Sequence, residues 1–562
     1  KDVLKVGGFS TDQLESARAR QLLRQEIDLG SSSLEVIFTS QEWTARDPRF
    51  IAETEQALAG LEGLPEVKRV VPHTVSQSQI SPDGHTAYAV VVLNVQPEVS
   101  QRLMPELERR IRPPETLTMY LSGAPAFYAD IERLTEEDLR RAELISFPFA
   151  VVALTIVFGS VVAAGLPILV GGVAVAATLA IIFLVGQALD LSIFVTNVVT
   201  MLGLGLGMDY SLLMTNRFRE ELRTHPVDEA LARTVATAGK AVVFSGLTVC
   251  VGLAGLFLFD FMMLRSIGFG GAVVVFLSVL AAVTLLPAAM GILGPRVSAL
   301  RVRPLIGEDR PGLWARLATW VMRHPILTLI PVLGLLLLLG SPFLHVRLSA
   351  PDARILPASV PSRQGLDLLD RAFGESDLAP ILIAVRATDP VLAPASLDAL
   401  FDFTRRIEAD PRVERVFSVV NLDPRISRDQ YKLLYAHPEA IPDVYARSTV
   451  RAIAGHHVTM VSVVPRASPL SDEAKDLVRD LRQVDPGPWL TFLVDGGTAE
   501  LMDVVDRLYS DFPKALGLIM LTTYLILLVL FRSVFLPIKA ILMNSLSILA
   551  SYGALVFVFQ DG

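Results

Sequence analysis

Residues 202–218 carry the sequence LGLGLGMDYSLLMTNRF, a run apolar enough to lie in a membrane that nevertheless contains an aspartate, Asp209. A charged side chain at that depth costs about 2.5–3.5 kcal/mol on insertion scales. Such a group usually faces the interior of a helix bundle, where it pairs with a neighbour or accepts a proton. The stretch therefore predicts a polytopic α-helical membrane protein with an acid inside one span. A structural polar residue, satisfied by a neighbouring helix, is the alternative for Asp209.

The 562-residue chain combines two kinds of sequence. Its mean hydropathy is +0.49, and 19% of its residues are charged, against about 25% in soluble domains. Residues 1–142 and 345–512 have the charge density of globular domains, whereas 143–344 and 513–562 are dominated by apolar runs. The net charge of −8 gives no indication of a nucleic-acid partner, and the single cysteine, Cys250, excludes an intrachain disulfide framework.

Eight apolar runs reach the length of about 20 residues that a helix needs to cross a bilayer. They are residues 143–162, 165–187, 191–216, 240–260, 262–293, 325–344, 513–531 and 535–559. The first five form a group at 143–294, and residues 295–324 connect this group to the sixth run. The chain opens with a polar segment, KDVLKVGGFS, and not with a signal peptide. We therefore expect an excerpt of a longer protein whose preceding span is missing.

Basic residues near the span ends predict the orientation, because Lys and Arg accumulate on the cytoplasmic side. The connection after Asn216 and the connection 295–324 are both rich in arginine, and Arg532 and Lys539 flank the turn between the last two runs. In the two longer connections the basic residues are Arg217, Arg219, Arg223, Arg233, Lys240, Arg296, Arg301, Arg303, Arg310, Arg316 and Arg323. All three connections are expected in the cytoplasm. Both globular segments are then extracytoplasmic domains of a protein in the cytoplasmic (inner) membrane.

The two globular segments share one pattern of elements. In the first, we predict strands at 33–40, 67–73, 86–95 and 116–123 and helices at 49–61 and 99–111. In the second, we predict strands at 380–387, 413–420, 457–465 and 489–496 and helices at 396–410 and 471–484. Both orders are βαββαβ, a ferredoxin-like α+β pattern, with an insertion near 421–450 in the second copy.

The repeat continues into the spans. At one constant offset Gly123 matches Gly496, Asp138 matches Asp511, Phe158 matches Phe531 and Ser160 matches Ser533. The architecture predicted is therefore a two-fold pseudo-repeat, in which each copy has one span, an outside α+β domain and then further spans, and the second copy is truncated. Such repeats are common in transporters, where the functional site lies near the bilayer midplane between the halves.

The neighbours of Asp209 favour a proton-accepting site. The hydroxyl of Tyr210 can donate to an ionised carboxylate, and Gly205 lies four residues before Asp209 on the same helical face, where a missing side chain lets another helix approach. A stripe of polar side chains on the same span could line a wet route or make only interhelical hydrogen bonds. It consists of Asn197, Thr200, Ser211 and Thr215.

Several other chemistries have no motif in the sequence. There is no G-x-x-x-x-G-K-[ST], no G-x-S-x-G and no His/Cys spacing of a metal site. We therefore predict no cofactor, no metal site and no enzyme active site. Energy for any transport must then come from an ion gradient, in which a proton gains roughly 2.3 kcal/mol per 100 mV.

Four stretches carry a resemblance to a known family. They are GGFSTDQLESARARQLL (7–23), FGSVVAAGLPILVGG (158–172), GLGLGMDYSLLMTNRFREEL (203–222) and ARTVATAGKAVVFSGLTV (232–249). They resemble the mycobacterial membrane protein large (MMPL) family of the resistance–nodulation–division (RND) superfamily, over essentially the whole chain. The resemblance implies twelve spans and a proton relay of two Asp-Tyr pairs. The first pair is Asp209 and Tyr210, the second would follow Gly562, and Ser245 would face the first pair.

The resemblance also implies a function. We expect proton-motive-force-driven export of a lipid, glycolipid, siderophore or drug-like molecule by a secondary active transporter embedded among membrane lipids, with accessory cell-envelope proteins as possible partners. Two alternatives share the superfamily: a sterol-sensing-type receptor or scaffold, and a protein-translocation accessory. Nothing in the residues selects the cargo.

Overall fold

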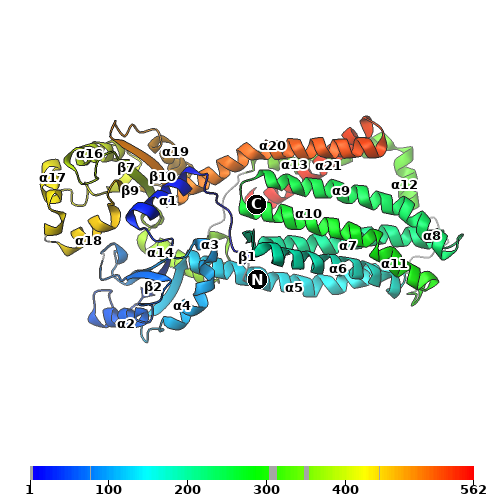
Figure 1. Ribbon diagram of the computed structural model, residues 1–562, viewed down its shortest axis with the longest axis horizontal. Helices are drawn as coiled ribbons and strands as arrows, with labels where there is room; N and C mark the ends of the chain where they lie inside the picture. The colour runs from blue at the N-terminus through cyan, green and yellow to red at the C-terminus, as the bar shows by residue number, and fades with distance from the viewer. Residues whose placement is uncertain (1–3, 76, 303–312, 347–352, 442, 562) are drawn as a thin grey trace. The chain divides into compact units, whose positions relative to one another are not determined.

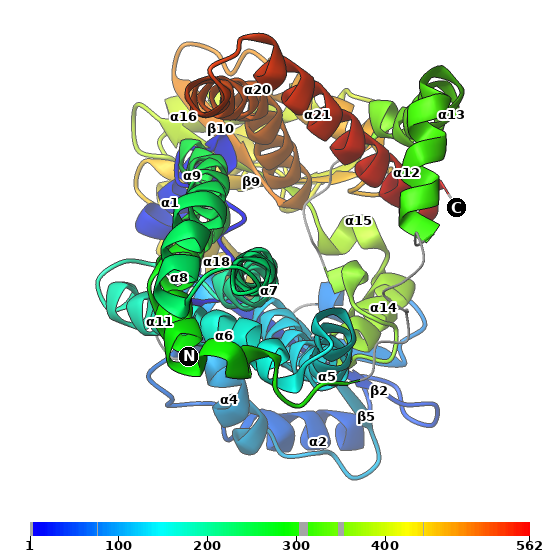
Figure 2. The same ribbon diagram turned by 90° about the vertical axis from the view of Figure 1, so that its right-hand side faces the viewer.

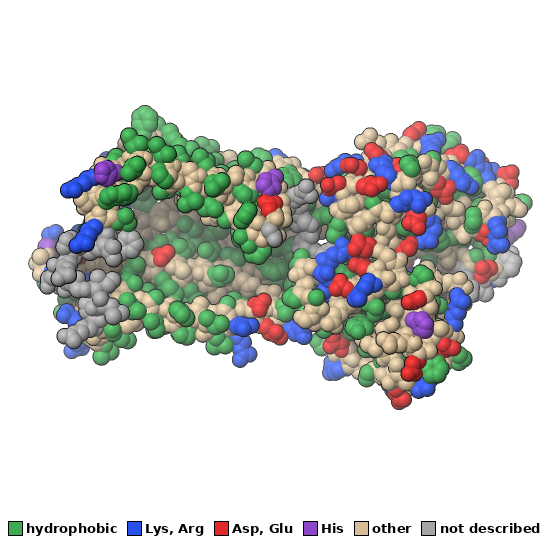
Figure 3. Space-filling view, turned by 180° about the vertical axis from the view of Figure 1, so that it is seen from behind, with side chains coloured by type: hydrophobic (Ala, Val, Ile, Leu, Met, Phe, Trp, Pro, Cys, Tyr) green, Lys and Arg blue, Asp and Glu red, His purple; other side chains and the backbone are tan. Residues whose placement is uncertain are grey.

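The computed structural model describes residues 4–75, 77–302, 313–346, 353–441 and 443–561. The chain divides into two compact units. The helical unit comprises residues 1–4, 138–348 and 509–562, and the α+β unit comprises residues 5–137 and 349–508. Figure 3 shows hydrophobic side chains over most of the visible face of the helical unit, whereas acidic and basic side chains are mixed over the α+β unit.

The α+β unit contains two copies of one arrangement (Figure 1). The first copy consists of β2 (Ser32–Thr39), α2 (Pro48–Leu58), β3 (Val67–Val71), β4 (Thr86–Leu93), α3 (Pro97–Ser100), α4 (Met104–Arg110) and β5 (Thr118–Gly123). The second consists of β7 (Ile381–Ala387), α16 (Pro394–Glu408), β8 (Val413–Phe417), β9 (Val458–Pro465), α19 (Asp472–Leu481) and β10 (Leu490–Asp495). The insertion adds α17 (Arg428–Ala436) and α18 (Val444–Ile453). The observed order of strands and helices is the one predicted from the sequence.

Each copy forms an antiparallel sheet of four strands, with orders β3-β4-β2-β5 and β10-β7-β9-β8. The two sheets also share an irregularity. The register shifts between Val67 and Arg69 where β3 pairs with β4, and between Val413 and Arg415 where β8 pairs with β9. An extra residue in the same place of both copies supports the internal repeat, because such bulges are specific features of a strand pair.

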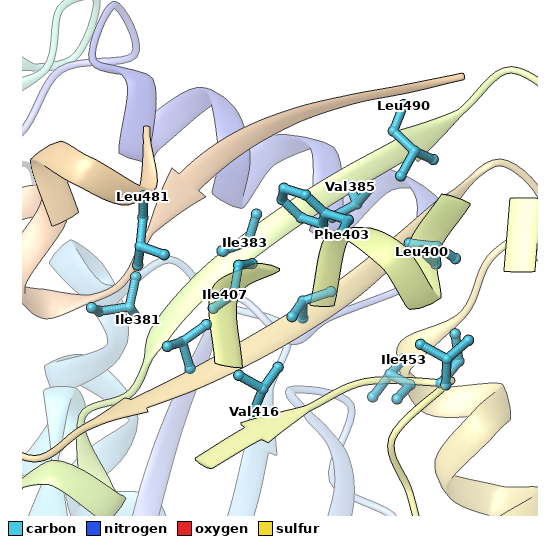
Figure 4. Packing of buried hydrophobic residues seen from close by; sticks show 14 of the residues in the cluster. Ile381, Ile383, Val385, Leu400, Phe403, Ile407, Val416, Ile453, Leu481 and Leu490 are labelled. Carbon is cyan, nitrogen blue, oxygen red and sulfur yellow. The ribbon is translucent and has the colours of Figure 1, made fainter. Parts of the chain in front are cut away.

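Apolar residues from both sheet and helices form each core. In the second copy Phe403 and Ile407 of α16 are directed at Ile383 and Val385 of β7, as Figure 4 shows. All four are at most 1% exposed. Alternate residues of a strand point to opposite faces, so this core occupies one face of the sheet and leaves the other face for a different partner.

The other face of each sheet is covered by a helix from the opposite half of the chain, which the sequence did not reveal. Helix α1 (Glu15–Ile27) packs on β10, β9 and β7, while α14 (Pro361–Phe373) packs on β5. A Cβ on Gly365 of α14 would lie 2.7 Å from the Leu121 carbonyl oxygen, so the backbones touch there. Both helices have 13 residues and precede the first strand of their own copy. The two copies have therefore exchanged equivalent helices.

The helical unit contains the membrane-type segments (Figures 1 and 2). Within the described residues eight helical segments are long and apolar enough to span a membrane, the number expected from the sequence. They are Ala124–Phe158, Val161–Gly186, Phe194–Glu221, Val227–Leu258, Met262–Ser298, Pro325–His345, Gly497–Phe531 and Phe535–Asp561. The first and seventh are single 35-residue helices, α5 and α20, that begin directly after the last strand of each copy. Equivalent positions therefore extend the repeat from the sheets into the spans.

The spans start and stop at places that differ from the apolar runs. Helix α7 (Phe194–Glu221) continues past Asn216, and the next segment already begins at α8 (Val227–Thr234). It passes through a π-helical turn (Val235–Gly239) into α9 (Lys240–Ala254). Residues 222–226, with Arg223, form the turn, and the other charged residues of this predicted connection lie in helices. Charged side chains end an apolar run without interrupting the backbone hydrogen bonds of the helix. Arg303 and Arg310 of the predicted cytoplasmic connection lie outside the described residues.

The remaining elements complete the chain. They are β1 (Leu4–Lys5), α6 (Val161–Gly186), β6 (Leu191–Ser192), α10 (Met262–Val283), α11 (Leu285–Leu293), α12 (Leu313–Arg323), α13 (Pro325–Gly340), α15 (Glu375–Leu378) and α21 (Phe535–Val556). Helix α7 packs against both α6 and α10, and α10 also packs against α9. Helix α13 packs against α21.

Candidate functional site

Glycines fix the position of α7 in the helical unit. A Cβ on Gly207 would lie 2.5 Å from the Cα of Gly171 on α6, and a Cβ on Gly203 would lie 2.4 Å from Val175. Residues four apart share one side of a helix, so Gly203 and Gly207 form the side on which α6 and α7 make backbone contact. Small residues allow such close packing between spans.

Asp209 lies on the opposite, open side of α7. Both Asp209 and Gly205 are exposed, and a Cβ on Gly205 would meet no atom within 4 Å. In the described part of the chain no hydrogen bond or ion pair to the Asp209 carboxylate is found. The sequence correctly placed Gly205 and Asp209 on one face. The close approach expected at Gly205 is made instead by Gly203 and Gly207, since these two face α6.

Tyr210 points inward from the next position of the helix. Its side chain is 5% exposed, and its hydroxyl is directed at Ser245 on α9 without the geometry of a full hydrogen bond. A Cβ on Gly246 would lie at an ordinary contact distance of 3.5 Å from that hydroxyl but would clash with Val279, so this glycine makes room for Val279 of α10 beside the tyrosine. Ser245 itself is exposed, like Asp209. The structure therefore gathers Tyr210, Ser245 and Gly246 between α7 and α9.

The polar stripe lies on a different side of α7 from Asp209. Ser211 and Thr215 are 0% exposed, and their hydroxyls have no hydrogen-bond partner among the described residues. Thr200 donates to the carbonyl oxygen of Thr196 at 2.9 Å, and Asn197 is half-buried. Ser211 follows Asp209 by two residues, about 200° around the helix. The stripe and Asp209 therefore do not line a common surface on this part of the protein.

The arrangement places an ionisable carboxyl group within an apolar span, where a charged side chain is costly. A buried tyrosine hydroxyl without a full hydrogen bond lies at the neighbouring residue. Across the described residues no group of three or more His, Cys, Asp or Glu side chains is placed to hold a metal ion.

A second candidate site is a cavity of about 780 Å³ inside the α+β unit. Side chains from both copies line it, including aromatic rings from Phe9, Tyr88, Phe127 and Tyr128. Its charged lining residues are Arg20, Glu35, Arg354, Asp370, Glu375, Asp377 and Glu500. Sequence reasoning missed this cavity, because it forms between strands of one copy and helices of the other.

Most charges around this cavity are paired. Arg20 of α1 binds Asp495 through two contacts, with Nε–Oδ2 at 3.2 Å and Nη2–Oδ1 at 2.9 Å, and it also contacts Glu500. Burial alone would lower the pKa of Arg20, but the carboxylates of Glu500 and Asp495 raise it, so the guanidinium stays charged. Arg354 bridges Asp370 and Glu375, each at 3.0 Å.

A family model and individual relatives match this chain. The model of the MMPL family covers residues 9–328 and 354–562. The Streptomyces coelicolor protein SCO6666, described only as a membrane protein, is 32% identical over 92% of this chain and 67% of its own length. The heme uptake protein MmpL11 of Mycobacterium tuberculosis is 32% identical, and the trehalose monomycolate exporter MmpL3 of Mycolicibacterium smegmatis is 28% identical. For both relatives the alignment covers 79% of this chain and 44% of the relative's own length. This chain therefore spans about half the length of these two proteins.

A solved structure shares the fold. The cryo-EM structure of the hedgehog release protein Disp from the water bear Hypsibius dujardini matches 97% of this chain and 80% of its own chain. The TM-score is 0.55 and the sequence identity is 13%. The likeness at this identity concerns the arrangement of the elements alone.

Proposed function

This chain belongs to the MMPL family, and from that premise we propose that it is a multi-pass secondary transporter that couples proton movement to the export of a hydrophobic or amphiphilic molecule. In this proposal Asp209 and Tyr210 form the proton relay, supported by Ser245 and Gly205. The relatives named as a trehalose monomycolate exporter and a heme uptake protein handle large, partly hydrophobic molecules, which supports cargo of that class.

One observation carries the proposal. Asp209 lies in a helix whose apolar window has a mean hydropathy of 1.4, it has no partner within the described residues, and Tyr210 beside it is buried. The unpaired carboxylate of Asp209, on an exposed face of α7, can bind a proton. It can also face the second Asp-Tyr pair that the family resemblance implies.

We assign the two α+β domains, residues 1–142 and 345–512, to the extracytoplasmic side of the inner membrane. The arginines on the connection after α7 support this orientation, because basic connections stay in the cytoplasm. In this arrangement the cavity of the α+β unit would receive cargo from the outer leaflet or from the space outside the membrane.

The test uses the full protein reconstituted in proteoliposomes with an imposed pH gradient. The variant Asp209→Asn keeps the size of the side chain and removes its ionisable carboxyl group. We expect it to abolish proton flux and movement of a fluorescent lipid analogue. The matched control is Asp190→Asn, because this carboxylate lies near a span end, where charge is cheap. Expression and thermal unfolding of both variants should match the parent protein. Full proton-driven transport by Asp209→Asn would overturn the proposal.

The same preparation separates the alternatives. A sterol-sensing-type receptor or scaffold would keep its ligand response when the gradient is collapsed with an ionophore. A protein-translocation accessory would copurify with a secretion channel and would not move lipid analogues. A transporter loses cargo movement on collapse and regains it when the gradient is restored.

A further inference from the structure

One acid of the cavity lacks the charge compensation that the others have. Glu35 lies in β2, paired with Val90 of β4 and Ser122 of β5, on the sheet face away from the core. The Ser33 hydroxyl donates to Glu35 Oε1 at 2.7 Å. No Lys, Arg or His side chain of the described residues forms an ion pair with Glu35, and no nearby cation affects its pKa, which burial raises.

The internal repeat shows why Glu35 has no cation. Gly123 is the last residue of β5, and its repeat equivalent Gly496 directly follows the last residue of β10. Ser122 therefore corresponds to Asp495, and their cross-strand partners Glu35 and Leu382 correspond to each other. Each copy therefore has one acid in this cross-strand pair. In the first copy it is Glu35 on the first strand, and in the second copy it is Asp495 on the last strand.

The exchanged helices treat these two acids differently. Arg20, the sixth residue of α1, neutralises Asp495. The sixth residue of α14 is Leu366, which lines the cavity. The helix exchange thus brings an arginine to the acid of the second copy, whereas the equivalent residue of α14 is a leucine that lines the same cavity as Glu35.

We propose that a cation carried by the cargo occupies this place, so that the cavity selects amphiphiles with a positively charged amine and holds that group at Glu35. This inference rests on the proposed function, since it names the class of cargo. Tyr88 lies on the same sheet face as Glu35, and Phe127 occupies the position that corresponds to Glu500. Aromatic faces attract ammonium groups by cation–π interaction, by about 0.5–2 kcal/mol.

The other charged groups around Glu35 leave it as the available acid. Asp377, which is partly exposed, pairs with Arg415, and the remaining charged lining residues form the pairs of Arg20 and Arg354 described above. Burial, with the charges of Glu35 and Asp377, raises the pKa of Tyr88 to about 12, so this hydroxyl stays neutral. Binding of a cation must therefore displace a proton from Glu35 whenever that carboxyl is protonated in the empty cavity.

The test is calorimetric titration of the full protein in nanodiscs with hexyltrimethylammonium and with hexanol. The first probe is a permanent cation without a titratable proton, so any proton released comes from the protein. Repeating the titration in buffers of different ionisation enthalpy counts that proton. We expect at least tenfold tighter binding of the cation than of hexanol, with a proton release that is larger at acidic than at neutral pH.

Two variants decide the outcome. Glu35→Gln should lose the tenfold preference and the proton release, while Glu108→Gln, which removes an exposed acid of α4 outside the cavity, should keep both. Equal binding of both probes by the parent protein, or a cation preference retained by Glu35→Gln, would overturn the inference. These measurements use no gradient. If the parent protein shows proton-driven transport but no cation preference, this inference alone is contradicted. If it binds the cation through Glu35 but Asp209→Asn still transports fully, the proposed function alone is contradicted.

Discussion

Asp209 and Tyr210 are consecutive residues of α7, yet the carboxylate is exposed while the tyrosine is 5% exposed and directed at α9. The pair thus joins the open side of the helix to its packed side. In the relay proposed above, a proton taken up by the carboxylate would pass the neighbouring hydroxyl on its way to the packed side of the helix. This geometry leads to the first of four predictions.

Replacing Tyr210 by phenylalanine should reduce proton-coupled transport while leaving stability almost unchanged. The buried hydroxyl makes no full hydrogen bond in the described structure, so its removal should change the free energy of unfolding by less than about 1 kcal/mol. Proton flux in proteoliposomes and thermal unfolding measure the two effects. A large loss of stability would show that the hydroxyl is structural, and unchanged flux would exclude it from the relay.

Alanine at Gly207 and at Gly205 should have opposite effects on stability. A Cβ on Gly207 would lie 2.5 Å from Gly171 Cα, so the α6–α7 contact must open, at a cost of about 1–3 kcal/mol. A Cβ on Gly205 meets open space, and alanine favours a helix by about 1 kcal/mol over glycine. Thermal unfolding in detergent compares the two. Equal melting temperatures would contradict the packing role of Gly207.

Arg20→Met should destabilise the α+β unit, because it leaves the 2% exposed Asp495 without its cation. Breaking a buried pair in this way costs about 3–5 kcal/mol, and the partly exposed Arg20 favours the lower end. Adding Asp495→Asn to the same chain should restore part of the loss. Protease resistance of the extramembrane domains is a suitable measurement. If the double variant is no more stable than Arg20→Met, charge compensation is not the cause.

The stability of the α+β unit should depend on pH through Glu35. Burial raises the pKa of Glu35 in the folded protein, so the folded state binds this proton more tightly than the unfolded state. The contribution is fully present below the unfolded pKa of about 4.3 and is lost as pH rises through the folded pKa. Glu35→Gln should therefore match the parent protein at acidic pH and exceed its stability at neutral pH.

The exposed control Glu108→Gln should run parallel to the parent protein at every pH in that experiment. Chemical unfolding followed by intrinsic fluorescence at several pH values provides the comparison. A difference between Glu35→Gln and the parent protein that does not change with pH would mean that ionisation of Glu35 is not responsible.

Much of the fold was predictable because its signals are local. The eight apolar runs, the β-branched and aromatic residues of strands such as Thr86–Leu93, and the shared pattern around Val67 and Val413 need no knowledge of distant contacts. The candidate acid Asp209 was also predictable, because a carboxylate within an apolar run can be recognised from the sequence without knowing which helices surround it. Helix ends were less predictable: α7 continues through RFREE because intrahelical hydrogen bonds, not hydropathy, decide where it stops.

The sequence by itself determined the spans, the repeated βαββαβ order and the acid within α7, since periodicity and charge are properties of neighbouring residues. Only the tertiary structure decided that α1 and α14 are exchanged between the copies, that Arg20 therefore neutralises Asp495, and that Glu35 has no cationic partner among the described residues. The physical reason is that compensation of a buried charge depends on which side chain packing brings within a few ångströms, and residues hundreds of positions apart leave no local trace of that contact.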